Sequence, residues 1–311
     1  MIYSTVKGIY KMFVDLLGKT RIKLALHTQA PGGETLEELA EAYFDHGFDA
    51  ISITENWKYN GEGELKGVKI ISGCEYSMGG LGEGEEAYHI VGVGMTSDPE
   101  VPSAWKNMIK TARAKAAETI KMIKRHNGFA FVAYPVHNRN NAESILDFAE
   151  LEGIEIFNSE VEYGVSKNGY AGEIVDRMST FGISPVLIAS NGVNCYEDEE
   201  YLASIMVEAT DMDTSHILRA LRQGRFYSTE GPEIHIERIG ADKVKVVCSP
   251  ALKIEFFSDC GKTSAKLIEG EGLIQAEYCI KDGERFVRAE VTDGNGRMAW
   301  SNNVRFDDIY R

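Results

Sequence analysis

Cysteine is scarce in this sequence, and its spacing excludes a common structural use of the residue. The 311 residues include five cysteines, an odd number, and no two of them form a Cys-x-x-Cys pair. Small secreted proteins use regularly paired cysteines as a disulfide framework. We therefore predict a reduced compartment, and because no targeting segment is evident in the sequence, the cytoplasm is the expected location.

Long apolar runs and clusters of basic residues are also lacking. The apolar patch from Met12 to Leu17 is interrupted by Asp15 and is too short to span a bilayer, so we predict an N-terminal helix that packs on the fold. Lys and Arg number 33 against 48 for Asp and Glu, a formal net charge of −15. A nucleic-acid surface needs clustered Lys and Arg. We expect neither a membrane nor a nucleic acid as partner, and the oligomeric state stays open.

The sequence does contain a clear β-α-β unit near its start. Ile22 to Leu26 is a short apolar strand, and His27 follows it directly. Thr35 and Glu38 have the spacing of a capping box, which begins a helix. The next strand is predicted from Ala50 to Thr54. Because parallel α/β folds place their chemistry just past strand ends, the polar residues after these two strands are candidate site residues.

Strands and helices continue to alternate through the first part of the chain, and the pattern then changes. Repeated β-α alternation predicts a parallel sheet or barrel. From Tyr227 onward, short alternating runs lie between turn signals such as Asp282-Gly283, which is typical of a small β-sandwich. We place the boundary between Gly224 and Gly231 and predict two domains, residues 1–224 and 225–311.

Short motifs along this frame resemble those of one family. In order they are Ala25-Leu26-His27-Thr28, Thr54-Glu55-Asn56, Gly73-Cys74-Glu75, His89, Ala133-Tyr134-Pro135 and Ala189-Ser190-Asn191-Gly192-Val193. Their order and spacing, over about residues 21 to 195, resemble the PHP (polymerase and histidinol phosphatase) superfamily. Each motif alone is weak, but the series implies an α/β fold, a distorted PHP-type (β/α)7 barrel followed by a C-terminal all-β sandwich domain.

The resemblance also indicates which metal ligands have been lost. Family members typically use nine ligands for three metals, and five of those positions carry poor or impossible ligands here, namely Ala25, Asn56, Tyr134, Asn191 and Val193. Alanine and valine have no donor atom, and an asparagine oxygen is a weak ligand for zinc or manganese. A trinuclear site is therefore not expected.

The surviving ligand positions are His27, Glu75 and His89, and Glu55 keeps a carboxylate where the family has aspartate. Two histidines and one glutamate can hold one divalent metal ion (Zn, Mn or Fe) with positions left for water. We predict these three residues as metal ligands, with Glu55 as a further ligand or as a base. The alternative is that the trio is a relic, held by hydrogen bonds in a polar pocket, and binds no ion.

Two further observations complete the functional hypotheses. His137 lies two residues past Pro135 and is a candidate catalytic residue in place of the lost histidine, with a surface loop position as the alternative. Trp57 and Tyr134, at the expected pocket mouth, either line a ligand site or fill space that metals have vacated. The resemblance implies a metal-dependent hydrolase, a phosphoesterase acting on a small phosphorylated molecule. The second hypothesis is a non-catalytic, degenerate PHP protein that binds a ligand or a partner.

Overall fold

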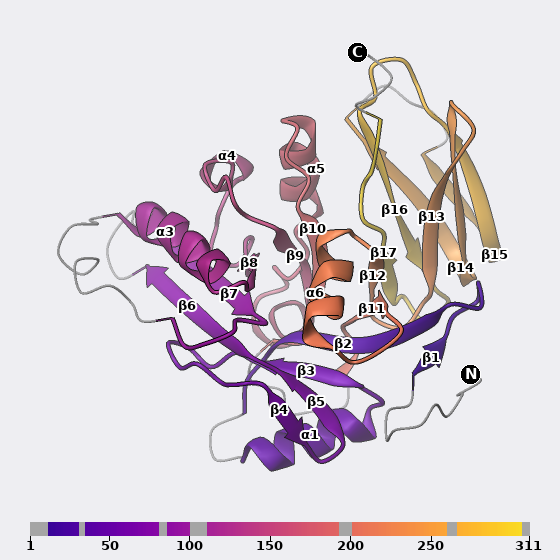
Figure 1. Cartoon of the computed structure of the whole chain (residues 1–311). Coiled ribbons are helices and arrows are strands. Elements are labelled where there is room, and N and C mark those ends of the chain that lie inside the picture. Colours follow the sequence, from indigo (N-terminus) through magenta and orange to yellow (C-terminus); the bar gives the residue numbers. More distant parts are fainter. Residues whose placement is uncertain are drawn as a thin grey trace.

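The computed structural model describes residues 12–30, 35–80, 86–99, 111–192, 201–259 and 266–306. These segments form an α/β structure with mixed sheets, in which strands outweigh helices. Figure 1 shows a part that contains all the labelled helices, together with the N-terminal strands, beside an all-strand part near the C-terminus.

The β-α-β unit near the start is formed as predicted. Strand β2 runs over Thr20–Thr28. The Thr35 side chain accepts a hydrogen bond from the Glu38 N–H, and the Glu38 carboxylate accepts one from the Thr35 N–H. This capping box begins helix α1, Leu36–Asp45. Strand β3, Ala50–Ile53, then returns parallel to β2.

The predicted N-terminal helix is wrong for the described part of the patch Met12–Leu17. Phe13–Val14 form a short strand, β1, antiparallel to β2. A tight turn follows, in which the Asp15 carbonyl accepts from the Gly18 N–H and the Asp15 carboxylate accepts from the Lys19 N–H. Aspartate favours such turns because its short side chain competes for nearby backbone N–H groups.

One large sheet joins the start of the chain to its end. Besides β1 to β3 it contains β4 (Gly63–Leu65), β5 (Val68–Ile71), β11 (Ser204–Glu208), β12 (Phe226–Thr229), β13 (Ile234–Ile239), β14 (Lys243–Ser258), β15 (Leu267–Cys279), β16 (Phe286–Thr292), β17 (Met298–Trp300) and β18 (Val304–Arg305). Its strand order is β13-β14-β16-β17-β12-β11-β2-β3-β5-β4. Because β12 pairs with β11 on one side and β17 on the other, the sheet passes from the α/β part into the all-strand part.

A second sheet has five strands in the order β10-β9-β8-β7-β6. These strands are β6 (Gly73–Gly79), β7 (Ala87–Val93), β8 (Phe129–Ala133), β9 (Gly153–Asn158) and β10 (Val186–Ser190). Strands β8, β9 and β10 are parallel, whereas β7 is antiparallel to both β6 and β8. The chain between β6 and β7 is too short for the crossover helix that a parallel pair needs, which explains their antiparallel pairing.

The expected closed barrel is not found in the described residues. A closed barrel needs a continuous hydrogen-bond ladder around its circumference. In the described residues the two sheets are instead joined by isolated bridges, Thr28 with Gly192 on one side, and Asn56 with Glu75 and Asn60 with Gly73 on the other. Strand β2 also shifts register against β3 between Ala25 and Thr28, which interrupts the ladder at this end of the strands. The result is two sheets that face each other around the carboxyl ends of β2 and β3.

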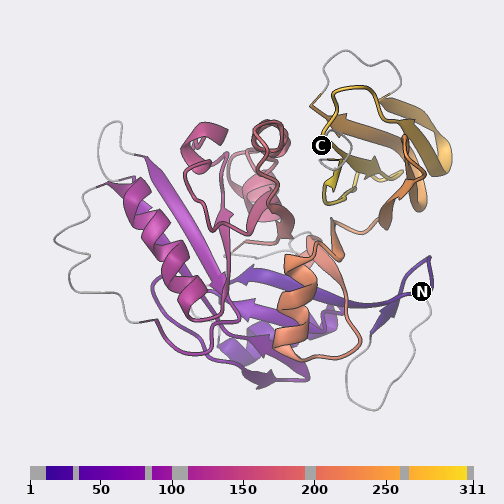
Figure 2. The same ribbon diagram turned by 45° about the horizontal axis from the view of Figure 1, so that its top comes forward.

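Helices cover the outer faces of both sheets. Helix α3, Ala112–Arg125, packs on β6, β7 and β8, and Figure 2 shows it lying along these strands. The others are α4 (Ala142–Ile145), η1 (a π-helix, Glu160–Val165), α5 (Gly172–Thr180) and α6 (Thr214–Arg222). Of these, α5 contacts β9 and α6 contacts β11. Among the described helices, none combines the length and the apolar character needed to cross a membrane.

From β12 onward, every described element is a strand, as predicted. These strands are hydrogen-bonded into one sheet, from whose main path β15 and β18 branch off at β14 and β16, so two separate sheets, as in a sandwich, are not formed among the described residues. Strand β14 pairs with β13 over its first half and with β16 over its second half, and its register against β15 shifts between Val247 and Lys253. Such irregularities bend a sheet, and the bent sheet encloses a core that includes Phe256 and Tyr278. The domain boundary near Gly224 stays a prediction.

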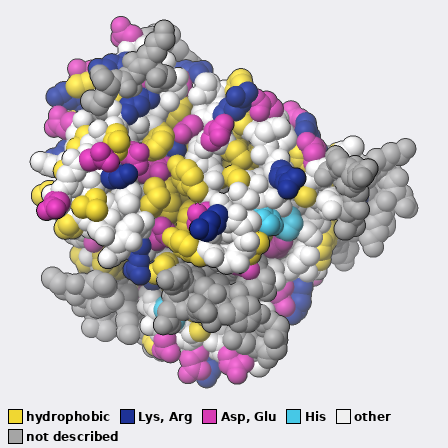
Figure 3. All heavy atoms as spheres, turned by 180° about the vertical axis from the view of Figure 1, so that it is seen from behind, with side chains coloured by type: hydrophobic (Ala, Val, Ile, Leu, Met, Phe, Trp, Pro, Cys, Tyr) yellow, Lys and Arg dark blue, Asp and Glu magenta, His cyan; other side chains and the backbone are white. Residues whose placement is uncertain are grey.

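Charged side chains of both signs are interspersed on the face shown in Figure 3. Among the described residues of this face, no block of one sign is seen. The chain has 48 acidic and 33 basic residues. A positively charged site on its surface would therefore be formed by a few basic residues that the fold brings together.

Candidate functional site

His27 lies at the centre of a buried chain of ion pairs. The side chain is fully buried, and both of its ring nitrogens face carboxylates. Nδ1 is 2.8 Å from Glu155 Oε1, and Nε2 is 2.8 Å from Glu75 Oε2. An ionised carboxylate can only accept hydrogen bonds, so two such contacts require a proton on each ring nitrogen.

The three predicted metal ligands meet in space. Glu75 on β6 is buried, and its other oxygen, Oε1, lies 2.8 Å from Nδ1 of His89 on β7. The direction of that approach does not suit a hydrogen bond, so His89 Nδ1 is a buried nitrogen without a hydrogen-bond partner in the described structure. His27, Glu75 and His89 come from three strands in two sheets, and they meet where those sheets face each other.

Glu155 is a site residue that sequence reasoning missed. It lies within β9 and is buried. Besides His27, it accepts hydrogen bonds from the Tyr134 N–H at 2.8 Å, from the Ser190 hydroxyl and from Asn158 Nδ2. Its position in the sequence, between Ile154 and Ile156 of a predicted buried strand, could have indicated a site residue. A carboxylate is buried in such a strand only when other groups pair with it.

The pKa values of His27 and Glu75 are both strongly shifted. At each residue the effect of burial opposes the effect of ion pairing. Burial acts to lower the pKa of His27, but the charges and hydrogen bonds of Glu155 and Glu75 outweigh it and raise that pKa to about 10. Burial acts to raise the pKa of Glu75, but the contacts with His27 and His89 outweigh it and lower that pKa to about 2. At neutral pH the cluster therefore contains a His27 imidazolium paired with a Glu75 carboxylate.

Tyr134 occupies the space beside both histidines. Its hydroxyl lies 3.4 Å from His27 Nε2, and its ring centroid lies 4.9 Å from that of His27 and 5.4 Å from that of His89. Its φ of 53° is in the left-handed region, which is uncommon for a bulky side chain. The Tyr134 side chain therefore lies against both histidines, and its two predicted roles, lining a ligand site or filling space, both stay predictions.

Glu55 contacts the trio through its backbone carbonyl. Its carbonyl accepts a hydrogen bond from the Glu75 N–H at 3.3 Å. Its carboxylate lies 2.7 Å from Lys58 Nζ, and its side chain is 27% exposed. The described contacts of this carboxylate do not include His27, Glu75 or His89. The predicted role of Glu55 as ligand or base therefore stays a prediction.

The remaining predicted positions lie further from the trio or outside the described residues. His137 is exposed, with its Nδ1 3.3 Å from Ser166 Oγ and its ring centroid 6.3 Å from that of Tyr134, so its catalytic role also stays a prediction. Ala25 is part of an apolar core. Val193 lies outside the described residues.

Two of the positions that the resemblance associates with metal ligands make hydrogen bonds within the protein. Asn56 Oδ1 accepts from the N–H and the hydroxyl of Ser77, at 3.3 and 3.0 Å. Asn191 is fully buried, and its Oδ1 accepts from the Ser159 hydroxyl at 3.4 Å. Both amides therefore have hydrogen-bond partners within the protein.

The donor chemistry of His27, Glu75 and His89 fits a single divalent cation. Two imidazoles and one carboxylate suit zinc or iron, and Glu155 is the carboxylate partner that a metal-binding histidine usually has. His89 Nδ1 is a buried nitrogen without a hydrogen-bond partner among the described residues. The trio is, however, in direct contact, and in the described part of the chain no group of three or more His, Cys, Asp or Glu side chains is arranged to hold a metal ion. Cation binding would thus require the contacts of Glu75 to open.

Comparison with known proteins gives a weak likeness to solved structures and no match in sequence. No family model matches the sequence, and no curated protein matches it. Among solved structures, the chain is similar to a protein from Bifidobacterium adolescentis that is proposed to be a metal-dependent phosphoesterase. The two share 13% sequence identity with a TM-score of 0.40, over 63% of this chain and 96% of the other.

Proposed function

We propose that this protein is a metal-dependent hydrolase of the phosphoesterase type, with one divalent cation held by His27, Glu75 and His89. The observation that supports this proposal is the convergence of the trio, in which each histidine lies 2.8 Å from one oxygen of Glu75. A buried cluster of titratable groups with strongly shifted pKa values is a common mark of a functional site.

Each residue of the cluster has a distinct role in this proposal. Glu155 holds His27 through Nδ1 and so directs Nε2 towards Glu75. His89, whose side chain is 29% exposed, gives the cluster its access to solvent. A bound cation would polarise a phosphoryl oxygen of a small phosphorylated substrate and lower the pKa of a water molecule. Glu55, at the end of β3, would accept the proton from that water.

A second candidate function is supported by a different observation. Both nitrogens of His27 already contact carboxylates, and the Tyr134 ring lies against both histidines. Together these contacts can replace a cation, because the imidazolium supplies the positive charge that the two carboxylates need. The protein would then be a non-catalytic member of its fold class that binds a ligand or a partner.

Metal analysis of matched variants separates the two candidates. Purified protein would be incubated with Zn²⁺, Mn²⁺ or Fe²⁺, desalted and analysed for bound metal, as wild type, His89→Ala and His126→Ala. His126 is the control because it ends α3 and contacts Ser97, away from the trio. One ion per chain in the wild type and the control, with none in folded His89→Ala, would support the proposal. No bound ion, or unchanged content in His89→Ala, would refute it.

A hydrolysis assay then tests the reaction. The three proteins would be assayed for hydrolysis of a generic aryl phosphate in the presence of the metal that binds. Turnover that is lost in His89→Ala and kept in His126→Ala would support a phosphoesterase. Metal binding with no turnover on a panel of phosphomonoesters and phosphodiesters would favour the binding module.

A further inference from the structure

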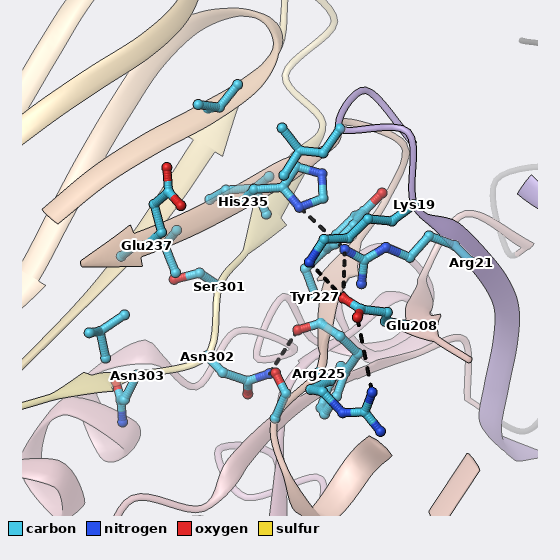
Figure 4. A pocket seen from close by; sticks show the side chains of 17 residues that line it. Lys19, Arg21, Glu208, Arg225, Tyr227, His235, Glu237, Ser301, Asn302 and Asn303 are labelled. Atoms are coloured by element: carbon cyan, nitrogen blue, oxygen red, sulfur yellow. Dashed lines mark hydrogen bonds and ion pairs between the residues drawn. The ribbon is translucent and has the colours of Figure 1, made fainter. Parts of the chain in front are cut away.

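Two adjoining hollows lie at the opposite end of β2 from His27, where the α/β part meets the all-strand part. Their volumes are about 300 and 340 Å³. Lys19, Glu208 and Arg225 line both, so these side chains form a shared wall. Figure 4 shows the first hollow, in which the side chains of Lys19, Arg21 and Arg225 are directed towards Glu208.

Cationic groups outnumber carboxylates around this wall. Lys19 Nζ lies 2.9 Å from the Glu208 carboxylate, Arg21 Nη2 lies at 3.7 Å and Arg225 Nη1 at 4.0 Å. Arg219, which lines the second hollow, has no ion-pair partner among the described residues. The two linings together contain four cationic side chains and two carboxylates, although the whole chain is strongly acidic.

The cationic groups differ in how firmly they are held. Arg21 is buried, and its Nε is 2.7 Å from Asp15 Oδ2, so Asp15 balances its charge and fixes its position. Lys19 and Arg225 are 49% and 42% exposed. The Arg225 Nε donates to Gln223 at 2.9 Å, while its Nη1 is at the outer limit of an ion pair with Glu208. Lys19, Arg219 and Arg225 are therefore the groups that can turn towards an incoming ligand.

We propose that these hollows bind a small anion through a phosphate or carboxylate group held by Lys19, Arg219 and Arg225. The guanidinium fork of arginine matches the oxygens of both groups. The body of the ligand would enter the first hollow beside Tyr227 and His235. A volume of about 300 Å³ is at the lower end of the range for small-molecule sites, which indicates a compact metabolite. Glu208 acts as the internal counter-ion that the ligand competes with.

The role of Glu208 provides a test that a damaged fold cannot imitate. Binding of inorganic phosphate and of citrate would be measured by isothermal titration calorimetry, in EDTA-treated protein and with sodium chloride at matched ionic strength. Glu208→Gln removes the competing carboxylate and should tighten binding of the anion by about tenfold, the effect of losing one charged contact. If only the affinity for phosphate increases, the natural ligand carries a phosphate group. If only the affinity for citrate increases, the natural ligand is a polycarboxylate.

The arginines provide the complementary test. The double variant Arg219→Gln/Arg225→Gln should weaken binding about tenfold or more, whereas Arg177→Gln, an exposed arginine on α5, should leave it unchanged. Binding that survives in the double variant, or no saturable binding of either anion by wild type and Glu208→Gln, would overturn the proposal. Binding lost in His89→Ala but kept in the double variant would assign the anion to the His27 cluster and overturn it too.

Discussion

His27 Nδ1 and Glu155 Oε1 lie 2.8 Å apart, although 128 residues separate them in the sequence. The contact joins β2 of the large sheet to β9 of the five-stranded sheet, and both side chains are buried. Because the carboxylate holds one ring nitrogen, it fixes the orientation of the ring and directs the other nitrogen to Glu75. Whatever the cluster binds, Glu155 is the residue that positions His27.

Replacement of Glu155 should reduce both stability and metal affinity. Glu155→Ala removes one partner of a buried ion pair, which typically costs about 3–5 kcal/mol. Glu155→Gln keeps an acceptor oxygen and should cost less, while lowering metal affinity by about 10–100-fold if a cation binds. Urea denaturation of metal-free protein and zinc titration would measure these effects, with the exposed Glu150→Gln as control. A Glu155→Ala variant as stable as the wild type would contradict the role assigned to this pair.

Replacement of Tyr134 by histidine should restore a donor atom to the cluster. Histidine tolerates the left-handed conformation of this position better than most residues do. A further ligand worth about 1.4 kcal/mol would tighten zinc binding about tenfold. Zinc titration of Tyr134→His and of Tyr134→Phe would check this, since phenylalanine keeps the ring and removes only the hydroxyl. Equal affinities in both variants would show that position 134 does not face the cation.

The sequence was sufficient for the local structure and for the convergence of the trio. Thr35 and Glu38 predicted the start of α1 because a capping box depends only on residues close in the chain. His27, Glu75 and His89 were predicted as one site from motif order, and they do meet. Their role as metal ligands stays a separate prediction.

What could not be predicted depends on pairing between distant segments. The isolated bridge between Thr28 and Gly192, in place of a continuous ladder, follows from register across two sheets, which no local pattern encodes. Glu155 was missed because its partners lie on other strands. The single path of the C-terminal strands depends on how β14 exchanges its neighbours along its length. In each case the deciding contact joins residues far apart in sequence.

Asp49 should make the protein less stable as the pH rises towards neutrality. Its side chain is buried, and burial raises its pKa from 3.8 to about 7, although the Lys23 N–H donates to its carboxylate. Between about pH 4 and pH 7 the folded state therefore binds more protons at Asp49 than the unfolded state does. The free energy of unfolding thus decreases as the pH rises through this range, and the contribution of Asp49 is lost above about pH 7. A shift of this size corresponds to a loss of about 4 kcal/mol.

The Asp49→Asn variant isolates this effect from the titration of other carboxyl groups. Asparagine keeps an acceptor oxygen for the Lys23 N–H and cannot ionise. The difference in unfolding free energy between variant and wild type, measured in urea from pH 4.5 to 7.5, should grow in favour of the variant as the pH rises. A difference that stays constant over this range would show that Asp49 titrates normally. Lys23, whose pKa burial lowers to about 8, changes charge mainly above this window.

Arg288 should be essential for holding the all-strand part against α5. It is fully buried on β16, its Nε and Nη2 lie 2.6 and 2.9 Å from the two oxygens of Asp176, and it also pairs with Glu290. Arg288→Met would leave the buried Glu290 without its cation, at a cost of about 3–5 kcal/mol. Asp176→Asn should cost less, because Asp176 is 25% exposed and can be solvated.

The same variant tests whether residues 1–224 and 225–311 unfold as separate domains. If Arg288 mainly couples the two parts, Arg288→Met should split the urea transition, with the backbone amides of β8 and of β14 losing hydrogen-exchange protection at different urea concentrations. These strands suit this purpose because β8 belongs to the five-stranded sheet of the α/β part and β14 to the all-strand part. A single transition at lower urea would instead indicate one cooperative unit, as the sheet that continues through β11, β12 and β17 favours.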